Sequence, residues 1–387
     1  MRLLLLQDAI YFPNRGGVTK ANRLLLEEMC SLGHACMAVA AAAGALASGD
    51  LRQALSERAI EYHLEDGVCR FVLNNVLVNA VMPEQSLQLK ARTIIEEFQP
   101  DWILVSSEDF GQRLLRAAAR YDPNRIVYIA HTLQFLPFGP ASFWPNRLGS
   151  ELLHRVRAIV TISAFVKDYL ETHGQLGSTQ LRFPLFGKPP IPLYTQPFTG
   201  FITMVNPSLI KGLSIFCELA KAFPELPFAA VASWGTTNKD LETLSSLSNV
   251  TVLPAVDDVE SIYSRTRILV APSIWYESFG LVVIEAMLRG IPVIASDTGG
   301  LKEAKLGTDY ALHVNPIIEY LSDLDENQLP IPIVPDQDIR PWITALGSLA
   351  GDSSQYRELA RESRARSMEY ARGADIRQFE SFLCSLS

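Results

Sequence analysis

Two glutamates flank the start of a predicted helix in the second half of the chain. Glu277 follows a strand predicted to end at Pro272, and Glu285 lies one to two turns inside a helix predicted over 278–290. One carboxylate therefore precedes the helix and the other lies within it, so the two do not form an ordinary helical pair. Each carboxylate can accept hydrogen bonds from two hydroxyl groups, which suits a sugar.

The helix start between these glutamates predicts an anion site. Ser278 is a suitable N-cap residue, and Gly280 allows a ligand to approach the first turn closely. The free N–H groups of Phe279, Gly280 and Leu281, together with the helix dipole, favour an anion. A phosphate flanked by sugars fits both the N–H groups and the carboxylates. The alternative is an ordinary helix start, with one glutamate as a favourable charge and the other on a solvated face.

The segment over 277–303, ESFGLVVIEAMLRGIPVIASDTGGLKE, resembles the donor-binding signature of retaining GT-B glycosyltransferases, specifically glycosyltransferase family four. That signature has two glutamates separated by seven residues, then a Gly-x-Pro-Val-x-Ala strand and a Gly-Gly-x-x-Glu turn. The resemblance implies that Glu277 holds hydroxyls of the donor sugar and that Glu285 holds the ribose hydroxyls. It also implies that Ser278 and the three N–H groups after it meet the diphosphate or the sugar. Gly299 and Gly300 would allow the next turn to pack closely.

The resemblance extends to the first half of the chain. Gly16 and Gly17, in NRGGVTKANRLLLEEMCSLGH, are similar to the family's amino-terminal Gly-Gly loop, whose N–H groups reach the donor phosphates. By itself a Gly-Gly turn is usually structural, and this one is not the dinucleotide-binding fingerprint. His131, in VYIAHTLQF, ends a predicted strand and resembles the family's His-Thr pair, which implies a position against the donor sugar.

Lys211 follows the first predicted strand of the second half, in MVNPSLIKGLSIF. In the family, an arginine and a lysine at this place neutralise the leaving diphosphate. The lysine matches, but Val205, Asn206 and Pro207 stand where the arginine is expected. We expect Asn206 to donate one neutral hydrogen bond, which is weaker than the paired bonds of a guanidinium group.

The elements around these residues alternate between strands and helices in both halves. Residues 2–6 are predicted to form a buried strand, followed by a turn-rich loop and a helix that ends at Gly33. A proline-rich stretch, Lys188 to Phe198, is predicted to be a linker, after which the alternation restarts. This pattern indicates two doubly wound parallel sheets. We therefore expect an α/β protein of GT-B fold, with two Rossmann-like domains facing a deep cleft.

The domain roles follow from the resemblance. Residues 1–187 are predicted to form the acceptor-side domain and residues 188–372 the nucleotide-sugar donor domain, with a terminal helix over 373–387 packing back on the first. The 387 residues are 48% hydrophobic and 20% charged, which excludes disordered and disulfide-scaffold classes. The net charge of −8 disfavours sequence-independent nucleic-acid binding.

The acidic excess lies in the second half. Residues 1–187 carry 18 basic and 18 acidic side chains, whereas 188–387 carry 16 and 24. An anion bound by the second half must therefore be held by local donors rather than by a general positive field. Six of these acids fall within 319–338, which we expect to be an acidic surface loop.

Several features point to a cytoplasmic enzyme that needs no metal. No apolar run is long enough to span a bilayer, the start is a poor signal peptide, and the five cysteines are scattered. The other histidines lack metal-ligand spacing, so we expect neither a metal nor a cofactor beyond a UDP- or GDP-type nucleotide sugar. Asp257 and Asp258 are read as helix caps. NRLGSELLHRVR over 146–157 is a mild candidate for membrane-surface contact, and the sequence leaves the oligomeric state open.

The acceptor is the least specified partner. Glu108 and Asp109 end another predicted strand, where they could touch an acceptor, although a structural role is the more common one for such residues. The apolar segment HTLQFLPFGPASFWP over 131–145 favours a partly hydrophobic small molecule or natural product.

The predicted reaction is glycosyl transfer with retention, with His131, Lys211 and Glu277 as the catalytic candidates. Three alternatives stay open at this point. They are a GT-B epimerase or hydrolase acting on a nucleotide sugar, a non-catalytic protein that binds sugar nucleotides, and a Rossmann dehydrogenase. The last is disfavoured because neither half opens with G-x-G-x-x-G.

Overall fold

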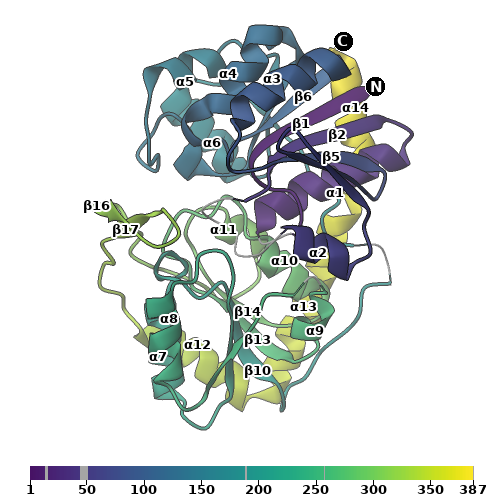
Figure 1. The fold of residues 1–387 in the computed structure, drawn as a ribbon. Helices are drawn as coiled ribbons and strands as arrows, with labels where there is room; N and C mark the ends of the chain where they lie inside the picture. The colour runs from purple at the N-terminus through teal and green to yellow at the C-terminus, as the bar shows by residue number, and fades with distance from the viewer. Residues whose placement is uncertain (14–15, 44–50, 188–189, 257, 387) are drawn as a thin grey trace. The chain divides into compact units, whose positions relative to one another are not determined.

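The computed structural model describes residues 1–13, 16–43, 51–187, 190–256 and 258–386 (Figure 1). Contacts divide the chain into two compact units. The first contains residues 1–185 and 374–387, and the second contains residues 186–373. The last helix of the chain, α14 (Ile376–Leu386), therefore belongs to the first unit although it follows the second in sequence.

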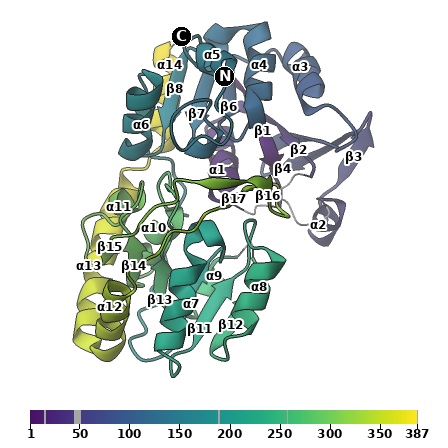
Figure 2. The same cartoon turned by 90° about the vertical axis from the view of Figure 1, so that its left-hand side faces the viewer.

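In the described residues, the first unit is built on a nine-stranded sheet with the order β3-β4-β5-β2-β1-β6-β7-β8-β9 (Figure 2). The strands are β1 (Arg2–Ile10), β2 (Ala35–Ala41), β3 (Tyr62–Glu65), β4 (Val68–Leu73), β5 (Val76–Val81), β6 (Trp102–Ser106), β7 (Ile126–Ala130), β8 (Ala158–Thr161) and β9 (Thr179–Gln180). All neighbours pair in parallel except β3–β4 and β4–β5, which pair antiparallel at one edge. The predicted doubly wound sheet is present, with an antiparallel edge that the sequence pattern did not indicate.

The first strand is longer than predicted. β1 continues to Ile10 rather than ending at residue 6, with an irregularity in its pairing to β2 between Gln7 and Ile10. The four leucines from Leu3 to Leu6 are fully buried, as expected for a strand covered on both faces. Polar Gln7 is buried as well.

The helices of the first unit are α1 (Gly17–Ser31), α2 (Leu51–Glu57), α3 (Leu87–Phe98), α4 (Arg113–Tyr121), α5 (Arg147–Leu153), α6 (Ala164–Gly174) and α14. Helix α1 contacts both β2 and α14. Three interactions tie α14 to this unit: His34 Nε2 lies 2.8 Å from Glu380 Oε1, Arg157 Nε donates to the Leu386 carbonyl at 3.0 Å, and Phe379 packs edge-on against Phe183.

The second unit contains a six-stranded sheet in its described residues, with the order β12-β11-β10-β13-β14-β15 and parallel pairing throughout. Its strands are β10 (Phe201–Val205), β11 (Phe228–Val231), β12 (Val250–Leu253), β13 (Thr266–Ala271), β14 (Val293–Ser296) and β15 (Ala311–Leu312). Its helices are α7 (Leu213–Ala222), α8 (Asn238–Ser245), α9 (Glu260–Tyr263), α10 (Leu281–Leu288), α11 (Leu301–Ala304), α12 (Arg340–Gly351) and α13 (Ser353–Arg372).

The strand order of the second unit places a topological switch point between β10 and β13. From β10 the chain moves outward through β11 and β12, and it then returns to add β13, β14 and β15 on the other side. In open α/β sheets, ligands bind outside the carboxyl ends of the strands at such a point. The segments that leave β10 and β13 carry Lys211 and Glu277.

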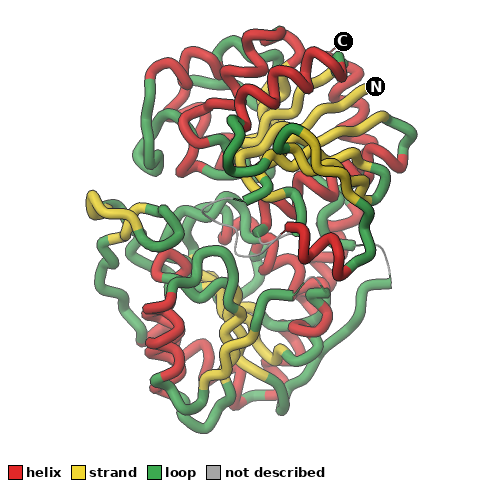
Figure 3. The backbone as a smooth tube through the Cα atoms, in the orientation of Figure 1, coloured by secondary structure: helices red, strands yellow, loops and turns green. Residues whose placement is uncertain are grey.

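The acidic segment over 319–338 is not a simple loop. It forms a small antiparallel hairpin from β16 (Tyr320–Leu324) and β17 (Pro330–Pro332), drawn in yellow in Figure 3. Its exposure agrees with the surface position expected for acidic residues, and Glu326 accepts hydrogen bonds from the N–H and side-chain amide of Asn238 at 2.6 and 2.8 Å. Across the described residues, the helices are too short or too polar for any of them to cross a membrane.

Among the described residues of the second unit, Lys305, which follows α11, is the most deeply buried cationic side chain. It is 1% exposed, its Nζ donates to the Val293 carbonyl at 2.6 Å, and burial lowers the pKa of its ammonium group to about 7. Between pH 7 and about 10.5 the unfolded chain therefore binds more protons at this residue than the folded chain does, so the residue's contribution to stability rises with pH across that window. Below pH 7 both states are protonated and the slope disappears.

We therefore expect Lys305→Met to remove this slope. Urea unfolding of wild type and variant between pH 6 and 10 measures it. The difference in unfolding free energy between wild type and Lys305→Met should change by up to about 1.4 kcal/mol per pH unit above pH 7. The exposed neighbour Lys302, replaced by methionine, is the control and should run parallel to wild type. Parallel curves for Lys305→Met as well would contradict the buried neutral lysine.

Candidate functional site

Lys211 is held at the carboxyl end of β10 by a short 3-10 turn, Leu209–Lys211. The next residue, Gly212, has φ +82 and begins α7. A Cβ at Gly212 would overlap the backbone of Pro272, so only glycine lets the two segments approach this closely. Close packing between the segments that follow β10 and β13 therefore fixes where Lys211 lies.

Backbone hydrogen bonds join these two segments directly. The Ile210 carbonyl accepts from the N–H of Ile274 at 3.1 Å, from the N–H of Trp275 at 3.2 Å and from the Ser273 hydroxyl at 3.3 Å. The loop that carries Glu277 is thus fastened to the turn that carries Lys211.

Lys211 and Glu277 form an ion pair between Nζ and Oε1. Their side chains are 17% and 16% exposed, so the pair is largely but not fully withdrawn from water. The Lys211 ammonium also lies 5.1 Å from the ring centre of Trp275 and 5.6 Å from that of Trp234. Two indole rings and a carboxylate therefore orient this cation, as cation–π geometry favours. The sequence-predicted Lys211 and Glu277 do come together, and the two tryptophans were not predicted.

The Gly299–Gly300 turn packs against the backbone of Glu277. The Gly300 N–H donates to the Glu277 carbonyl at 2.7 Å. Gly299 has φ +59, and a Cβ there would overlap the Glu277 carbonyl and lie 2.7 Å from the Glu277 nitrogen. The close packing predicted for this glycine pair is therefore present within the second unit.

Helix α10 begins later than predicted. It starts at Leu281 rather than near residue 278, and its N-cap is Gly280 with φ +101, without a side-chain cap. Ser278 is therefore not the N-cap. The left-handed conformation of Gly280 turns the chain into the helix, so the cap position falls two residues further on. The N–H groups of Phe279 and Gly280 precede the helix, and that of Leu281 lies in its first turn.

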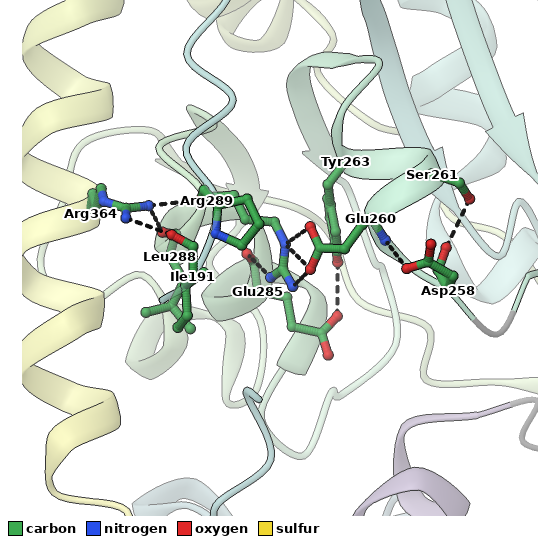
Figure 4. A network of polar contacts seen from close by, with 10 residues as sticks. Ile191, Asp258, Glu260, Ser261, Tyr263, Glu285, Leu288, Arg289 and Arg364 are labelled. Atoms are coloured by element: carbon green, nitrogen blue, oxygen red, sulfur yellow. Dashed lines mark hydrogen bonds and ion pairs between the residues drawn. The ribbon is translucent and has the colours of Figure 1, made fainter. Parts of the chain in front are cut away.

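Glu285 is buried, so the interpretation of this residue as part of a solvated face is wrong. Its side chain is 8% exposed, and its Oε2 accepts a hydrogen bond from the Tyr263 hydroxyl at 2.8 Å (Figure 4). Burial, followed by the nearby Glu285 carboxylate, raises the pKa of Tyr263 well above its usual value, so this hydroxyl stays a donor.

The backbone around Glu285 is fixed by two arginines. Arg289 donates from Nη1 to the Glu285 carbonyl at 2.8 Å and from Nε to both carboxylate oxygens of Glu260 at 3.0 and 3.1 Å. Arg364, on α13, donates to the Leu288 carbonyl and reaches the Ile191 carbonyl at 2.9 Å (Figure 4). The end of α10 is thereby anchored on both sides.

The Tyr263 hydroxyl is expected to matter for ligand binding as well as for stability. The resemblance implies that Glu285 holds the ribose hydroxyls of a nucleotide sugar, so Tyr263→Phe should raise the KM for that ligand about tenfold, because losing a hydrogen bond to a buried carboxylate costs roughly 1–3 kcal/mol. The matched control is Tyr128→Phe, since the buried Tyr128 hydroxyl has no hydrogen-bond partner within the described residues. Steady-state kinetics with both variants decides the point. An unchanged KM in Tyr263→Phe would show that Glu285 is positioned by other groups.

Asn206 occupies the place of the family's arginine and adopts φ +60. Its Oδ1 accepts from the Gly235 N–H at 3.0 Å, while its buried Nδ2 has no hydrogen-bond partner in the described residues. The Ser208 hydroxyl is buried and likewise lacks a partner there. Both groups border the α-carbon of Gly235, where a Cβ would lie 3.2 Å from Asn206 Nδ2 and 3.4 Å from Ser208 Oγ. Two neutral donors thus stand at this position, and Ser208 was not predicted.

In the first unit, His131 directly follows β7, as predicted. Its ring is 1% exposed, its Nε2 lies 2.8 Å from Asn22 Oδ1, and its N–H donates to the Ser107 hydroxyl at 2.9 Å. Burial lowers the pKa of this imidazole to about 3, so the ring is neutral. Asn22 was not singled out in the sequence. The signal was available, because a polar residue lies on the apolar face of the helix predicted after Gly17.

Gly16 is the N-cap of α1, and Gly17 is the first residue of the helix. The Gly16 carbonyl accepts from the Lys20 N–H at 3.1 Å and from the Thr19 hydroxyl at 3.0 Å. The loop and helix predicted around this pair are present. The contact of Gly16 and Gly17 with donor phosphates stays a prediction.

The acids at the end of β6 have different surroundings. Asp109 accepts from the N–H groups of Leu114 and Leu115 at 2.9 and 2.8 Å and so caps the start of α4, while burial raises the pKa of its carboxyl to about 7. This gives Asp109 a structural role. Glu108 is half-buried, and burial and then Asp8 raise its pKa to about 7.

The remaining acidic pair and the histidines bear on the metal question. Asp258 accepts from the Glu260 N–H at 3.1 Å at the start of α9, whereas Asp257 lies outside the described residues. No group of three or more His, Cys, Asp or Glu side chains within the described ranges is arranged to hold a metal ion.

Models of known protein families match both halves of the chain. A family model described as "Glycosyltransferase Family 4" matches residues 15–181, and one described as "Glycosyl transferases group 1" matches residues 198–318. Among curated proteins, a D-inositol 3-phosphate glycosyltransferase of Corynebacterium urealyticum is 27% identical over 219 residues, which is 52% of this chain and 45% of that protein. The chain matches less than half of the length of the first curated relatives, 31% of one and 45% of the other.

The solved structures that resemble the chain over its whole length include two that bear on the fold. Sucrose-phosphate synthase from Thermosynechococcus elongatus has a TM-score of 0.69 at 17% identity, with 100% of both chains covered. Anabaena Alr3699/HepE, in complex with UDP and glucose, has a TM-score of 0.67 at 16% identity, also with 100% of both chains covered. At these identities the likeness concerns the fold, and it confirms the predicted GT-B architecture of two Rossmann-like domains.

Proposed function

Because this chain belongs to glycosyltransferase family four, the glycosyl transferases group 1, we propose that it transfers a sugar from a nucleotide sugar to an acceptor hydroxyl or amine, with retention of anomeric configuration. The observation that carries this proposal is the Lys211–Glu277 ion pair beside the start of α10. It combines a cation with a sugar-binding carboxylate at the switch point of a parallel sheet, where such folds bind nucleotides.

The roles divide according to charge. Departure of a nucleoside diphosphate builds negative charge, which Lys211, the N–H groups of Phe279 to Leu281 and the amide of Asn206 stabilise as preorganised donors. Glu277 accepts hydrogen bonds from hydroxyls of the donor sugar. Its carboxylate also keeps Lys211 in place until the diphosphate binds. Glu285, whose carboxylate is hydrogen-bonded to Tyr263, accepts hydrogen bonds from the ribose hydroxyls.

The chemical step proceeds on one face of the sugar. A double displacement needs a carboxylate nucleophile about 5 Å from an acid. The carboxylates proposed here are committed otherwise, since Glu277 is paired with Lys211 and Glu285 with Tyr263. The leaving phosphate oxygen therefore takes the proton of the acceptor as the new glycosidic bond forms. Neither an epimerase nor a hydrolase is favoured by any feature of the site.

The substrates are proposed by class. The donor is a UDP- or GDP-sugar, with UDP supported by the structurally similar HepE, which was solved with UDP and with UDP-glucose. The acceptor is a small molecule, in keeping with a curated relative that is named for D-inositol 3-phosphate. The neutral Asn206–Ser208 pair implies weaker neutralisation of the diphosphate than an arginine would give. No metal or further cofactor takes part in this scheme.

Stereochemistry of slow donor hydrolysis tests the proposal without knowledge of the acceptor. UDP-glucose and GDP-mannose are incubated with the full chain, and the first sugar released is observed by ¹H NMR before it mutarotates. Release of the α-anomer together with UDP or GDP is the expected result. Release of the β-anomer, or a covalent glycosyl adduct on the protein by mass spectrometry, would overturn the proposed mechanism.

A further inference from the structure

A line of buried amides runs from the backbone of β1 to the ring of His131. Gln7 Nε2 donates to the Ala9 carbonyl at 3.1 Å, and Asn22 Nδ2 donates to Gln7 Oε1 at 3.0 Å. Asn22 Oδ1 then lies 2.8 Å from His131 Nε2. Gln7 and Asn22 are each fully buried, and all these residues belong to the first unit.

The direction of every bond in this line follows from its first member. A backbone carbonyl can only accept, so Gln7 must present its NH₂ group to Ala9 and its oxygen to Asn22. Asn22 must then present its NH₂ group to Gln7 and its oxygen to His131. An amide oxygen needs a donor, so His131 must carry its proton on Nε2. The network thus assigns both amide orientations and the histidine tautomer, which heavy-atom positions alone do not.

This tautomer leaves Nδ1 as a lone-pair acceptor. Nδ1 is buried and has no hydrogen-bond partner among the described residues. The Ser107 hydroxyl holds the backbone beside the ring, since it accepts from the backbone N–H groups of His131 and Thr132 at 2.9 and 3.0 Å. Phe183 packs edge-on against the ring itself. Burial lowers the pKa of the imidazole to about 3, so the acceptor is not lost to protonation near neutral pH.

A purely structural role does not account for this arrangement. An unpaired buried acceptor costs roughly 1–3 kcal/mol, and burying the two amides adds the desolvation of their own polar groups. An apolar residue at each of these positions would pack in the apolar surroundings of β1 and α1 without that cost. The arrangement is explained if Nδ1 has a partner that is present only when ligand is bound.

We propose that Gln7 and Asn22 are positioning residues that hold His131 in its neutral Nε2–H form, so that Nδ1 accepts a hydrogen bond from a hydroxyl of the donor sugar. The choice of ligand rests on the function proposed above, whereas the tautomer assignment does not. On this assignment His131 cannot act as a general acid, since it has no proton at the atom that meets the substrate. It binds and orients a hydroxyl instead.

The tautomer is measured directly by long-range ¹H–¹⁵N correlation spectra of the full chain labelled on histidine nitrogens. His131 is one of six histidines, and its signals are assigned by their loss in His131→Gln. Between pH 5.5 and 8 we expect one pyrrole-type nitrogen at Nε2 and one pyridine-type nitrogen at Nδ1. A proton on Nδ1, or a ring that is protonated at pH 6, would overturn the proposal.

Variants at Asn22 test the positioning role. Asn22→Leu should lose the single tautomer and lower kcat roughly ten- to a hundredfold with a smaller change in KM, as expected when a substrate-orienting group is misplaced. Asn22→Asp places a carboxylate against Nε2 and should raise the pKa of His131 by one unit or more. The control is Asn79→Leu, a buried asparagine on β5 that bonds Arg70 and the Ala38 carbonyl instead. If Asn22→Leu keeps both the tautomer and kcat, Gln7 and Asn22 are not positioning residues for His131.

Ligand titration separates this inference from the proposed function. UDP-glucose should shift the Nδ1 signal and leave the Nε2–H pattern intact, while UDP alone should leave Nδ1 unchanged. Equal shifts with both ligands would refute the sugar hydroxyl as the partner. If neither UDP-glucose nor UDP binds and no nucleotide sugar is turned over, the proposed function is refuted. The tautomer of His131 is decided separately, by the spectrum of the free protein.

Discussion

Replacing Lys211 with alanine lowers kcat for sugar transfer by roughly a hundred- to a thousandfold, the loss typical of removing one preorganised charge-stabilising donor. The reason is specific to this chain. Asn206 stands where a second cation is expected, so Lys211 is the principal positive charge proposed to meet the leaving diphosphate. Its ion pair with Glu277 is also lost, which frees the carboxylate proposed to orient the donor sugar.

The matched control for this variant is Lys221→Ala. Lys221 lies on α7, ten residues further on, and pairs with Glu218 on the surface with 57% of its side chain exposed. Lys221→Ala should keep the wild-type kcat, so the steady-state rates of the two variants should differ by the full hundred- to thousandfold. Their melting temperatures should be equal. Lys211→Arg should recover part of the rate, because it restores the charge but not the fit between the two tryptophans. A Lys211→Ala enzyme with more than a tenth of the wild-type kcat would contradict the role given to this residue.

Gly299→Ala should cost almost as much activity, although this residue makes no proposed contact with substrate. A Cβ at position 299 would overlap the Glu277 carbonyl, and its positive φ adds strain for any residue with a side chain. The loop that carries Glu277 must therefore move, which breaks its ion pair with Lys211. We expect kcat to fall about a hundredfold and stability to fall by roughly 2–4 kcal/mol.

Gly33→Ala separates the overlap from the backbone strain. Gly33 has φ +88, but a Cβ there meets nothing within 4 Å. This variant should lose only about 1 kcal/mol of stability and keep full activity. Thermal unfolding and kinetics measure both effects. If Gly299→Ala behaved like Gly33→Ala, close packing of the glycine turn against Glu277 would not be what shapes the site.

Much of the fold could be predicted from the sequence because its parallel strands are continuous apolar runs. Leu3–Leu6 illustrates this, and each such run is followed by a helical pattern. The antiparallel β3–β4 edge could not be predicted in the same way. Its outer strand, Tyr62–Glu65, is exposed along its length, so no hydrophobic alternation marks it. The hairpin β16–β17 was hidden for the same reason, because its prolines and acids are typical of loops.

The candidate site was predictable where one residue type at one spacing carries the chemistry. Lys211 and Glu277 are 66 positions apart, yet each follows a strand of one sheet, and the structure joins them. Trp234 and Tyr263 were missed because their roles depend on which loops and helices pack beside them. The start of α10 was misplaced by the choice of Ser278 as cap. Gly280, with positive φ, was the stronger signal.

The measurement that tests the central claim most directly is ligand-induced stabilisation of the full chain by UDP-glucose, GDP-mannose and NAD. At a hundredfold excess over Kd, a ligand that binds the folded state adds about 2.7 kcal/mol and raises the melting temperature by several degrees. We predict such a rise with at least one of the two nucleotide sugars, reduced in Lys211→Ala and in Glu285→Gln, and none with NAD. A rise with NAD and none with either nucleotide sugar would contradict the donor site described for the second unit.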